Sequence, residues 1–231
     1  MIPLRDDVPS RTAPVVNITV IAACTLVFIW QLSLGERGFQ EALYAFGLVP
    51  ATLLGNARLP PEFYAVPPVA TVFTSMFLHG GLLHLLGNML FLWIFGDNVE
   101  DAMGHLRFGV FYLCCGVVAA LAQSLPNPDT TVPMIGASGA ISGVLGAYLL
   151  LYPRARILVL IPLGLLTQIA RLPAVVVLGL WFVLQIASSL LAAPGTGGVA
   201  FGAHVGGFVA GMLLVWVFKR RRSARARQLR I

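Results

Sequence analysis

Five long stretches without a single Asp, Glu, Lys or Arg constrain this chain more than any other feature of its sequence. A helix needs about 20 mainly apolar residues to cross a bilayer core of about 30 Å. Each stretch is long enough for one crossing, and the last is long enough for two, with the turn-forming sequence PGTGG at 194–198 inside it. The charge-free stretches are residues 12–35, 63–96, 108–128, 130–153 and 172–218. We therefore expect an all-α integral membrane protein that forms a bundle of six transmembrane helices.

The composition excludes an ordinary soluble domain. Only 10% of the residues are charged and 58% are hydrophobic, whereas about 25% of the residues of a typical soluble domain are charged. The expected organisation is a leader at 1–13, a six-helix membrane domain at 14–218 and a basic tail at 219–231. We expect no removable signal sequence, because acidic residues and prolines precede the first apolar run.

The expected membrane helices begin and end close to the limits of the charge-free stretches. They cover about 14–34, 75–95, 108–122, 138–152, 173–191 and 201–218. Residues 35–68 are expected to form an irregular loop that lies partly in the membrane interface. Residues 157–171 are expected to run along the inner membrane surface.

Basic residues predict the orientation of the chain. Of the 15 Lys and Arg residues, all except Arg37 and Arg58 fall on one side of the six-helix scheme, and this side also holds both termini. Because cytoplasmic loops are enriched in Lys and Arg, both termini are expected in the cytoplasm, and the expected location is a bacterial cytoplasmic membrane. Orientation and contact with membrane lipids account for the net charge of +6, so the charge does not require a nucleic-acid partner.

A few polar side chains lie inside the expected helices, where they are costly and usually face the interior of a bundle. Ser138, His204 and His84 lie 16, 15 and 13 residues before the charged residue that ends each helix. At about 1.5 Å per residue they are about 24, 22 and 20 Å from that end, at nearly the same depth. A serine hydroxyl attacks only when a base takes its proton, so Ser138 and His204 are candidates for a nucleophile and its base.

Two polar residues share one face of the second helix. Asn88 follows His84 by four residues, and both side chains, with the backbone N–H of Ser138 at a helix start, could stabilise an oxygen anion. Interhelical hydrogen bonding that only fixes the fold is the alternative role of both residues. His79 lies about 140° around the helix from His84, and we assign it to structure or to hydration of a cavity.

Small residues near Ser138 and His204 predict that their two helices approach closely. Gly139 and Gly143 follow the serine, and four glycines surround the histidine, at 202, 206, 207 and 211. Packing alone explains such patterns in many membrane helices. The histidine at matching depth favours catalysis over packing alone.

Four motifs, in this order along the chain, resemble those of the rhomboid intramembrane serine proteases. They are HGGLLHLLGN at 79–88, EDAMGHLRF at 100–108, GASG at 136–139 and AHVGGFVAG at 203–211. The resemblance covers nearly the whole chain. It implies a six-helix core, a Ser–His dyad without an acidic third member, and hydrolysis of peptide bonds in or beside the transmembrane helices of membrane-protein substrates.

The resemblance also implies roles for individual residues. Ser138 would be the nucleophile and His204 the general base, and the oxyanion would be supported by His84, Asn88 and the backbone of Ser138. His105 lies in the expected cytoplasmic turn, away from this site, and no cofactor or metal is expected. The residues of the structural motifs are Gly136, Gly139, Gly207 and Gly211, together with Glu100 and Arg107, which would tie the cytoplasmic turn together.

One position departs from the family pattern. Some rhomboids place an aromatic residue four positions after the nucleophile, where it packs on the catalytic imidazole, and this chain has Ser142 there. Packing from another helix or a hydrogen bond from Ser142 could replace the aromatic side chain.

Three other classes of protein are alternatives to a protease. A transporter or channel usually places a carboxylate in the membrane, and no Asp or Glu lies inside an expected crossing. A metal site would need His79, His84 and His204, but the five-residue spacing of the first two is poor for chelation from one helix. An inactive rhomboid-like protein that binds or escorts client helices is the main alternative, although such a protein is expected to lack the nucleophile or the base.

Overall fold

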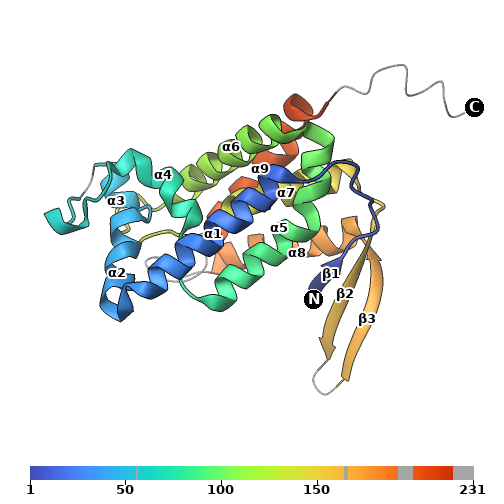
Figure 1. The fold of residues 1–231 in the computed structure, drawn as a ribbon, viewed down its shortest axis with the longest axis horizontal. Helices are drawn as coiled ribbons and strands as arrows, with labels where there is room; N and C mark the ends of the chain where they lie inside the picture. The colour runs from blue at the N-terminus through green and yellow to red at the C-terminus, as the bar shows by residue number, and fades with distance from the viewer. Residues whose placement is uncertain (56, 164–165, 192–199, 221–231) are drawn as a thin grey trace, which may run out of the picture.

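The computed structural model describes residues 1–55, 57–163, 166–191 and 200–220. These residues form a helical bundle with a small sheet at one end (Figure 1). Most of the expected basic tail at 219–231, and the turn expected at 194–198, lie outside the described residues.

Five helices in the described part of the chain are long and apolar enough to cross a membrane. Each corresponds to one of the expected crossings, so the chain is a mostly helical, multi-pass membrane protein. The five helices are α1 (Val15–Ser33), α5 (Leu82–Met103), α6 (His105–Ser124), α8 (Ala174–Leu191) and α9 (Phe201–Phe218).

The remaining expected crossing is α7 (Ser138–Leu151), which is shorter than the other five. Its 14 residues span about 21 Å, less than a hydrocarbon core of about 30 Å. Residues 139–148 are all buried, and α7 packs against α5, α6 and α9. Protein therefore surrounds α7, and its serine and glycine residues are shielded from lipid.

The expectation of an all-α fold is wrong. Three strands, β1 (Ile2–Arg5), β2 (Arg156–Leu163) and β3 (Leu166–Pro173), form an antiparallel sheet in the order β1-β2-β3. The segment expected to run along the inner surface is thus a hairpin, and the leader adds a strand to it. Ile157 and Val159, which are two residues apart and point to the same face, are fully buried in the core.

The connection after α1 is also more regular than expected. The amphipathic helix α2 (Gly35–Phe46) buries Ala42 and Ala45. Short helical turns follow, and the expected irregular loop is therefore largely helical. These turns are α3 (Pro50–Leu53), η1 (Pro61–Phe63), η2 (Pro68–Ala70), α4 (Thr71–Thr74) and η3 (Ser75–Phe77).

Helix α5 begins later than expected, because Gln31 of α1 holds the preceding segment, and it also ends later than expected. The Gln31 amide accepts a hydrogen bond from the His79 N–H (3.0 Å) and donates one to the His79 carbonyl (3.2 Å). These bonds satisfy the backbone of His79 outside a helix. At the other end α5 continues to Met103, and the turn into α6 is Gly104, whose φ of 84° suits a glycine.

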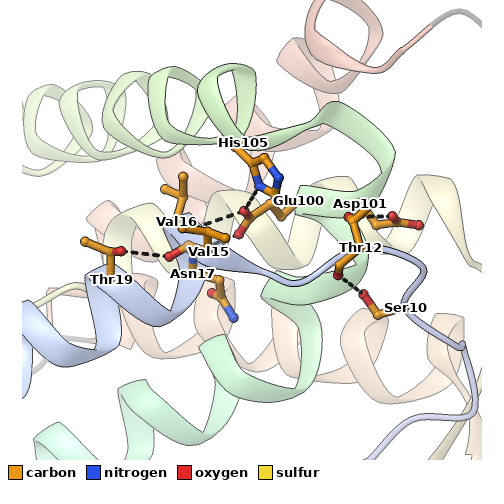
Figure 2. Close-up of polar contacts among 9 residues, drawn as sticks. All are labelled: Ser10, Thr12, Val15, Val16, Asn17, Thr19, Glu100, Asp101 and His105. Carbon is orange, nitrogen blue, oxygen red and sulfur yellow. Dashed lines mark hydrogen bonds and ion pairs between the residues drawn. The ribbon is translucent and has the colours of Figure 1, made fainter.

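Glu100 holds the start of α1, as Figure 2 shows. Its buried carboxylate accepts hydrogen bonds from the N–H groups of Val16 (3.0 Å) and Asn17 (2.8 Å). His105 Nδ1 contacts the same carboxylate at 2.5 Å. Unpaired amides at a helix start favour a negative charge, so Glu100 joins α1, α5 and α6 at this end of the bundle.

Arg107, expected to share this task, is exposed. Among the described residues it makes no ion pair or side-chain hydrogen bond, since the ion pairs there are Arg37–Glu41 and Glu100–His105. The tie expected between Glu100 and Arg107 is therefore made by Glu100, the start of α1 and His105.

Candidate active site

The polar side chains expected at one depth all line a single cavity of about 640 Å³. Ser138 is the first residue of α7, and His204 lies in the first turn of α9. His84 and Asn88 enter the cavity from α5. Sequence reasoning thus identified four residues that the fold brings together from three helices.

Glycines allow α7 and α9 to pack with their backbones in contact. A Cβ atom added to Gly207 would overlap the carbonyl oxygen of Gly139, and one added to Gly211 would overlap the carbonyl oxygen of Gly143. A Cβ on Gly139 would lie 2.7 Å from the Cβ of Ala119 on α6. Larger side chains at these positions would separate the helices that carry Ser138 and His204.

His204 is held from α8. Its Nδ1 lies 2.7 Å from Oε1 of Gln185, and the ring centroid of Trp181 is 5.9 Å from its own. A carbonyl oxygen can only accept a hydrogen bond, so Nδ1 carries the proton and Nε2 keeps its lone pair. This tautomer makes Nε2 the nitrogen that can take a proton from a hydroxyl.

The Ser138 hydroxyl is half-buried and free of hydrogen bonds to other described residues, His204 included. Catalytic hydrogen bonds are often long before a substrate binds. The neighbours of the two residues are already in contact range, because a Cβ on Gly139 would lie 3.7 Å from the Cβ of Ala203. Ser138 and His204 therefore face one cavity from helices that touch beside them.

His79 orients Asn88. The fully buried His79 ring has Nδ1 3.2 Å from the Phe77 carbonyl and Nε2 3.0 Å from Nδ2 of Asn88. Nδ1–H therefore donates a hydrogen bond to the Phe77 carbonyl, and Nε2 accepts a hydrogen bond from one of the two N–H groups of the Asn88 amide. The second amide proton remains available to the cavity, so His79 has the structural role expected of it.

His84 presents an N–H group beside the loop that leads to Ser138. The Gly80 N–H donates to Nδ1 of His84 at 3.4 Å, so Nε2 carries the proton. A Cβ on Gly136 would lie 2.7 Å from this Nε2 atom, and Gly136 also has a φ of 112°. A glycine is therefore required at position 136 for two reasons: its backbone conformation is unfavourable for other residues, and His84 leaves no room for a Cβ atom.

Ser142 makes no side-chain hydrogen bond to His204 in the described structure. Its hydroxyl donates to the Ser138 carbonyl oxygen at 2.6 Å, within α7. Of the two substitutes expected for the missing aromatic residue, packing from another helix is the one present, and Trp181 of α8 provides it.

Sequence reasoning missed Gln185 and Trp181. Gln185 is a polar side chain in a charge-free stretch, the same signal that identified His84 and Asn88. Trp181 lines the cavity, but nothing in the sequence distinguishes it from a lipid-facing tryptophan.

The histidines do not form a metal site in the described part of the chain. No three His, Cys, Asp or Glu side chains there are grouped so that they could hold a metal ion. His79 and His84 stack edge to face with ring centroids 5.1 Å apart, and the polar contacts of His204 are with Gln185 instead.

Comparison with known proteins places the motifs in a family. The family model of the Rhomboid domain matches residues 67–221, more than half of the chain. The chain is 34% identical over 136 residues to Rhomboid protease GluP of Bacillus subtilis (strain 168), which covers 59% of this chain and 24% of that protein. It is 34% identical over 149 residues to RHOMBOID-like protein 1 of Arabidopsis thaliana, covering 64% and 34%.

A third relative extends the match. Rhomboid-like protein 11, chloroplastic, of Arabidopsis thaliana is 30% identical over 161 residues, which cover 65% of this chain and 53% of that protein. In these three relatives the matched part is between about a quarter and about half of the relative's length.

Proposed function

Because this chain belongs to the rhomboid family, we propose that it is an intramembrane serine endopeptidase that cleaves membrane proteins in or beside their transmembrane helices. The observation that carries the proposal is the shared cavity: a serine at the start of α7 and a histidine on α9 line it together with Asn88 and His84. One of the matched relatives is named a rhomboid protease.

In the proposed reaction Ser138 is the nucleophile and His204 the general base. The Ser138 oxygen bonds to the carbonyl carbon of the substrate while its proton moves to Nε2 of His204. The carbon–nitrogen bond then breaks, and the leaving amine takes the proton from Nε2. A water molecule repeats the attack on the acyl-enzyme and releases the second product.

The oxyanion of the intermediate would be stabilised by three donors. These are the second amide proton of Asn88, the Nε2–H of His84 and the backbone N–H of Ser138, which is unpaired at a helix start. Hydrogen bonds from the Asn88 amide to His79 and from the Gly80 N–H to His84 support these roles, because they fix the orientation of Asn88 and His84 before a substrate arrives.

Gln185 and Trp181 would keep His204 in its reactive orientation. The Gln185 carbonyl oxygen accepts a hydrogen bond from Nδ1–H of His204, as an acidic residue does in a catalytic triad. Trp181 packs near the ring where Ser142 leaves no aromatic neighbour. We infer that α8 thereby supplies the positioning that a dyad alone lacks.

The substrates would be membrane proteins whose helices unwind easily. A helix in lipid satisfies its backbone internally, so its carbonyl groups are hidden from Ser138 until a segment opens. The cavity is lined largely by apolar side chains, including Phe91, Met134 and Leu145, which suits small or apolar residues around the cleaved bond.

We propose that α7 is the sixth membrane helix, which would put both termini on the same side, and the positive-inside rule makes that side the cytoplasm. The relatives described above come from a plant and a bacterium, so the comparisons do not favour the bacterial membrane that was expected from the sequence.

The test is cleavage of a panel of labelled single-pass helices by the purified protein. Ser138→Ala and His204→Ala are expected to abolish cleavage without changing insertion, and Ser138→Ala is also expected to leave thermal unfolding unchanged. Ser33→Ala is the matched control, because Ser33 is an exposed serine at the far end of α1. Retained cleavage in Ser138→Ala would reject the protease and leave the alternative, a relative that binds or escorts client helices without cutting them.

A further inference from the structure

Three arginines converge on the outer face of the sheet, at the opposite end of α7 from Ser138. Arg5, Arg156 and Arg171 are exposed and line one cavity of about 90 Å³ with Leu158. Arg5 and Arg171 are the cross-strand partners of Leu158 on its two sides. Arg156 lies two residues before Leu158 on β2 and therefore points to the same face.

None of these guanidinium groups has a carboxylate partner within 4 Å among the described residues, whose ion pairs lie elsewhere. Asp6 and Asp7 line the same cavity but are engaged by other groups. Asp6 accepts a hydrogen bond from the Tyr148 hydroxyl, and Asp7 accepts one from the Arg156 backbone N–H at 2.8 Å. Three cations therefore share the cavity with at most two anions.

An apolar row lies beside the arginines on the same face. Ile2 and Ile169 both pair with Leu160, which lies two residues after Leu158. Ile2 is 46% exposed and Ile169 is 63% exposed. The face is therefore basic near the bundle and apolar towards the end of the hairpin.

The sheet can lie only at the surface of the membrane. Within the described sheet, β3 pairs on one side alone, and unpaired strand edges do not occur in hydrocarbon. The hairpin projects from the end of the helical bundle (Figure 1), directly after α7 and directly before α8. At the membrane surface, the basic part of this face lies at the depth of the lipid phosphates and the apolar part at the depth of the upper acyl chains.

We propose that the outer face of the sheet binds an anionic phospholipid. Its phosphate would sit among Arg5, Arg156 and Arg171, because guanidinium groups bind phosphate oxygens in pairs. Its glycerol and upper acyl carbons would contact Ile2 and Ile169. The site is separate from the catalytic cavity and does not depend on the proposed protease activity.

The full chain in neutral detergent, titrated with phosphatidylglycerol and followed by native mass spectrometry, tests the proposal. The triple variant Arg5→Gln, Arg156→Gln, Arg171→Gln is expected to bind about 100-fold more weakly, since each basic residue near an anionic surface contributes about fivefold. The control variant replaces three other exposed arginines, expected on the same side of the membrane, by glutamine and so removes the same charge. These arginines are at positions 11, 107 and 154. The control is expected to bind within about twofold of the unmodified protein.

Two further measurements separate a lipid from a small anion. Ile2→Ser with Ile169→Ser is expected to weaken phosphatidylglycerol binding and to leave the binding of inorganic phosphate unchanged. Equal losses in the two triple variants would overturn the proposal in favour of general charge attraction. The proposal would be overturned in favour of a small-anion site if the isoleucine substitutions left phosphatidylglycerol binding unchanged and inorganic phosphate displaced the lipid completely. Arg171→Gln alone repeats the test if the triple variant does not fold.

Discussion

Gln185→Leu is expected to lower the turnover number of this protein while its KM stays nearly constant. The leucine has a similar size but no acceptor, so Nδ1–H of His204 loses the partner that it has at 2.7 Å. His204 is only 9% exposed, so water cannot readily replace the lost acceptor. Gln185 is not among the residues that line the substrate cavity, and substrate affinity should therefore change little.

The size of the effect follows from the hydrogen bond. A buried donor left without a partner costs about 1–3 kcal/mol, and the ring can avoid this cost by turning Nδ1 to another acceptor. The reactive orientation is then less favourable by the same amount. At about 1.4 kcal/mol for each factor of ten in rate, kcat should fall about 5- to 150-fold.

The assay is steady-state cleavage of a labelled single-pass helix, with thermal unfolding measured on the same preparations. Gln185→Glu keeps an acceptor and should restore most of the turnover, and its charge should shift the acidic limb of the pH–rate profile to higher pH. His84 is the other titratable group that faces the cavity and is the same in all variants. Leu184→Ala is the control, because Leu184 is the neighbouring residue on α8 and is 53% exposed.

Two results would refute the reasoning. Turnover of Gln185→Leu within twofold of the unmodified protein would show that the hydrogen bond does not orient the base. Equal losses in Gln185→Leu and Gln185→Glu would show that the side chain acts through packing and not as an acceptor.

Three further predictions concern stability. Glu100→Gln should lower the free energy of unfolding by at least about 1.5 kcal/mol, because it removes the charge that both amides at the start of α1 contact; chemical unfolding in mixed micelles measures this loss, and no loss would contradict the capping role. Gly211→Ala should reduce both stability and turnover, because its Cβ would overlap the Gly143 carbonyl and overpacking costs about 1–3 kcal/mol; Gly179→Ala, whose added Cβ would meet nothing within 4 Å, should reduce neither. Burial raises the pKa of the Asp6 carboxyl above its ordinary value of 3.8, so its contribution to stability is complete below pH 3.8 and is lost as the pH rises through the raised pKa; Asp6→Asn should flatten the dependence of thermal stability on pH in this range, and an unchanged slope would contradict the role of Asp6.

The helices were predictable because a bilayer imposes length and excludes charge. The limits of α1, α8 and α9 differ from the expected ones by at most a residue. The start of α5 was not predictable, because it depends on Gln31 of a different helix holding the backbone of His79. The absence of charged residues indicates which segments can lie in lipid. It does not indicate where a side chain from another helix ends a helix early.

The sheet escaped prediction because residues 157–161 of its central strand β2 are apolar on both faces. Ile157 and Val159 face the core, and Leu158 and Leu160 face outwards. A half-buried strand is normally recognised by alternating polar and apolar residues, and here that alternation is absent. Leu158 and Leu160 lie on the outward face beside the arginines, and this mixture of apolar and basic residues agrees with a strand at a membrane surface.

The depth of Gln185 could have been estimated from the sequence in the same way as the depths of Ser138 and His204. Gln185 lies 14 residues after Arg171, which is about 21 Å along a helix and close to the depths of His84 and His204. Depth gives the level of a side chain but not the direction in which it points, and a glutamine at that level on α8 could equally have faced a different helix. The direction follows from the packing of α8 beside α9, where Phe182 stacks on Phe208 with ring centroids 4.3 Å apart. This stack fixes α8 against α9 one turn beyond His204 and thereby directs Gln185 towards the imidazole. Neither the polarity of Gln185 nor its depth predicts this aromatic contact.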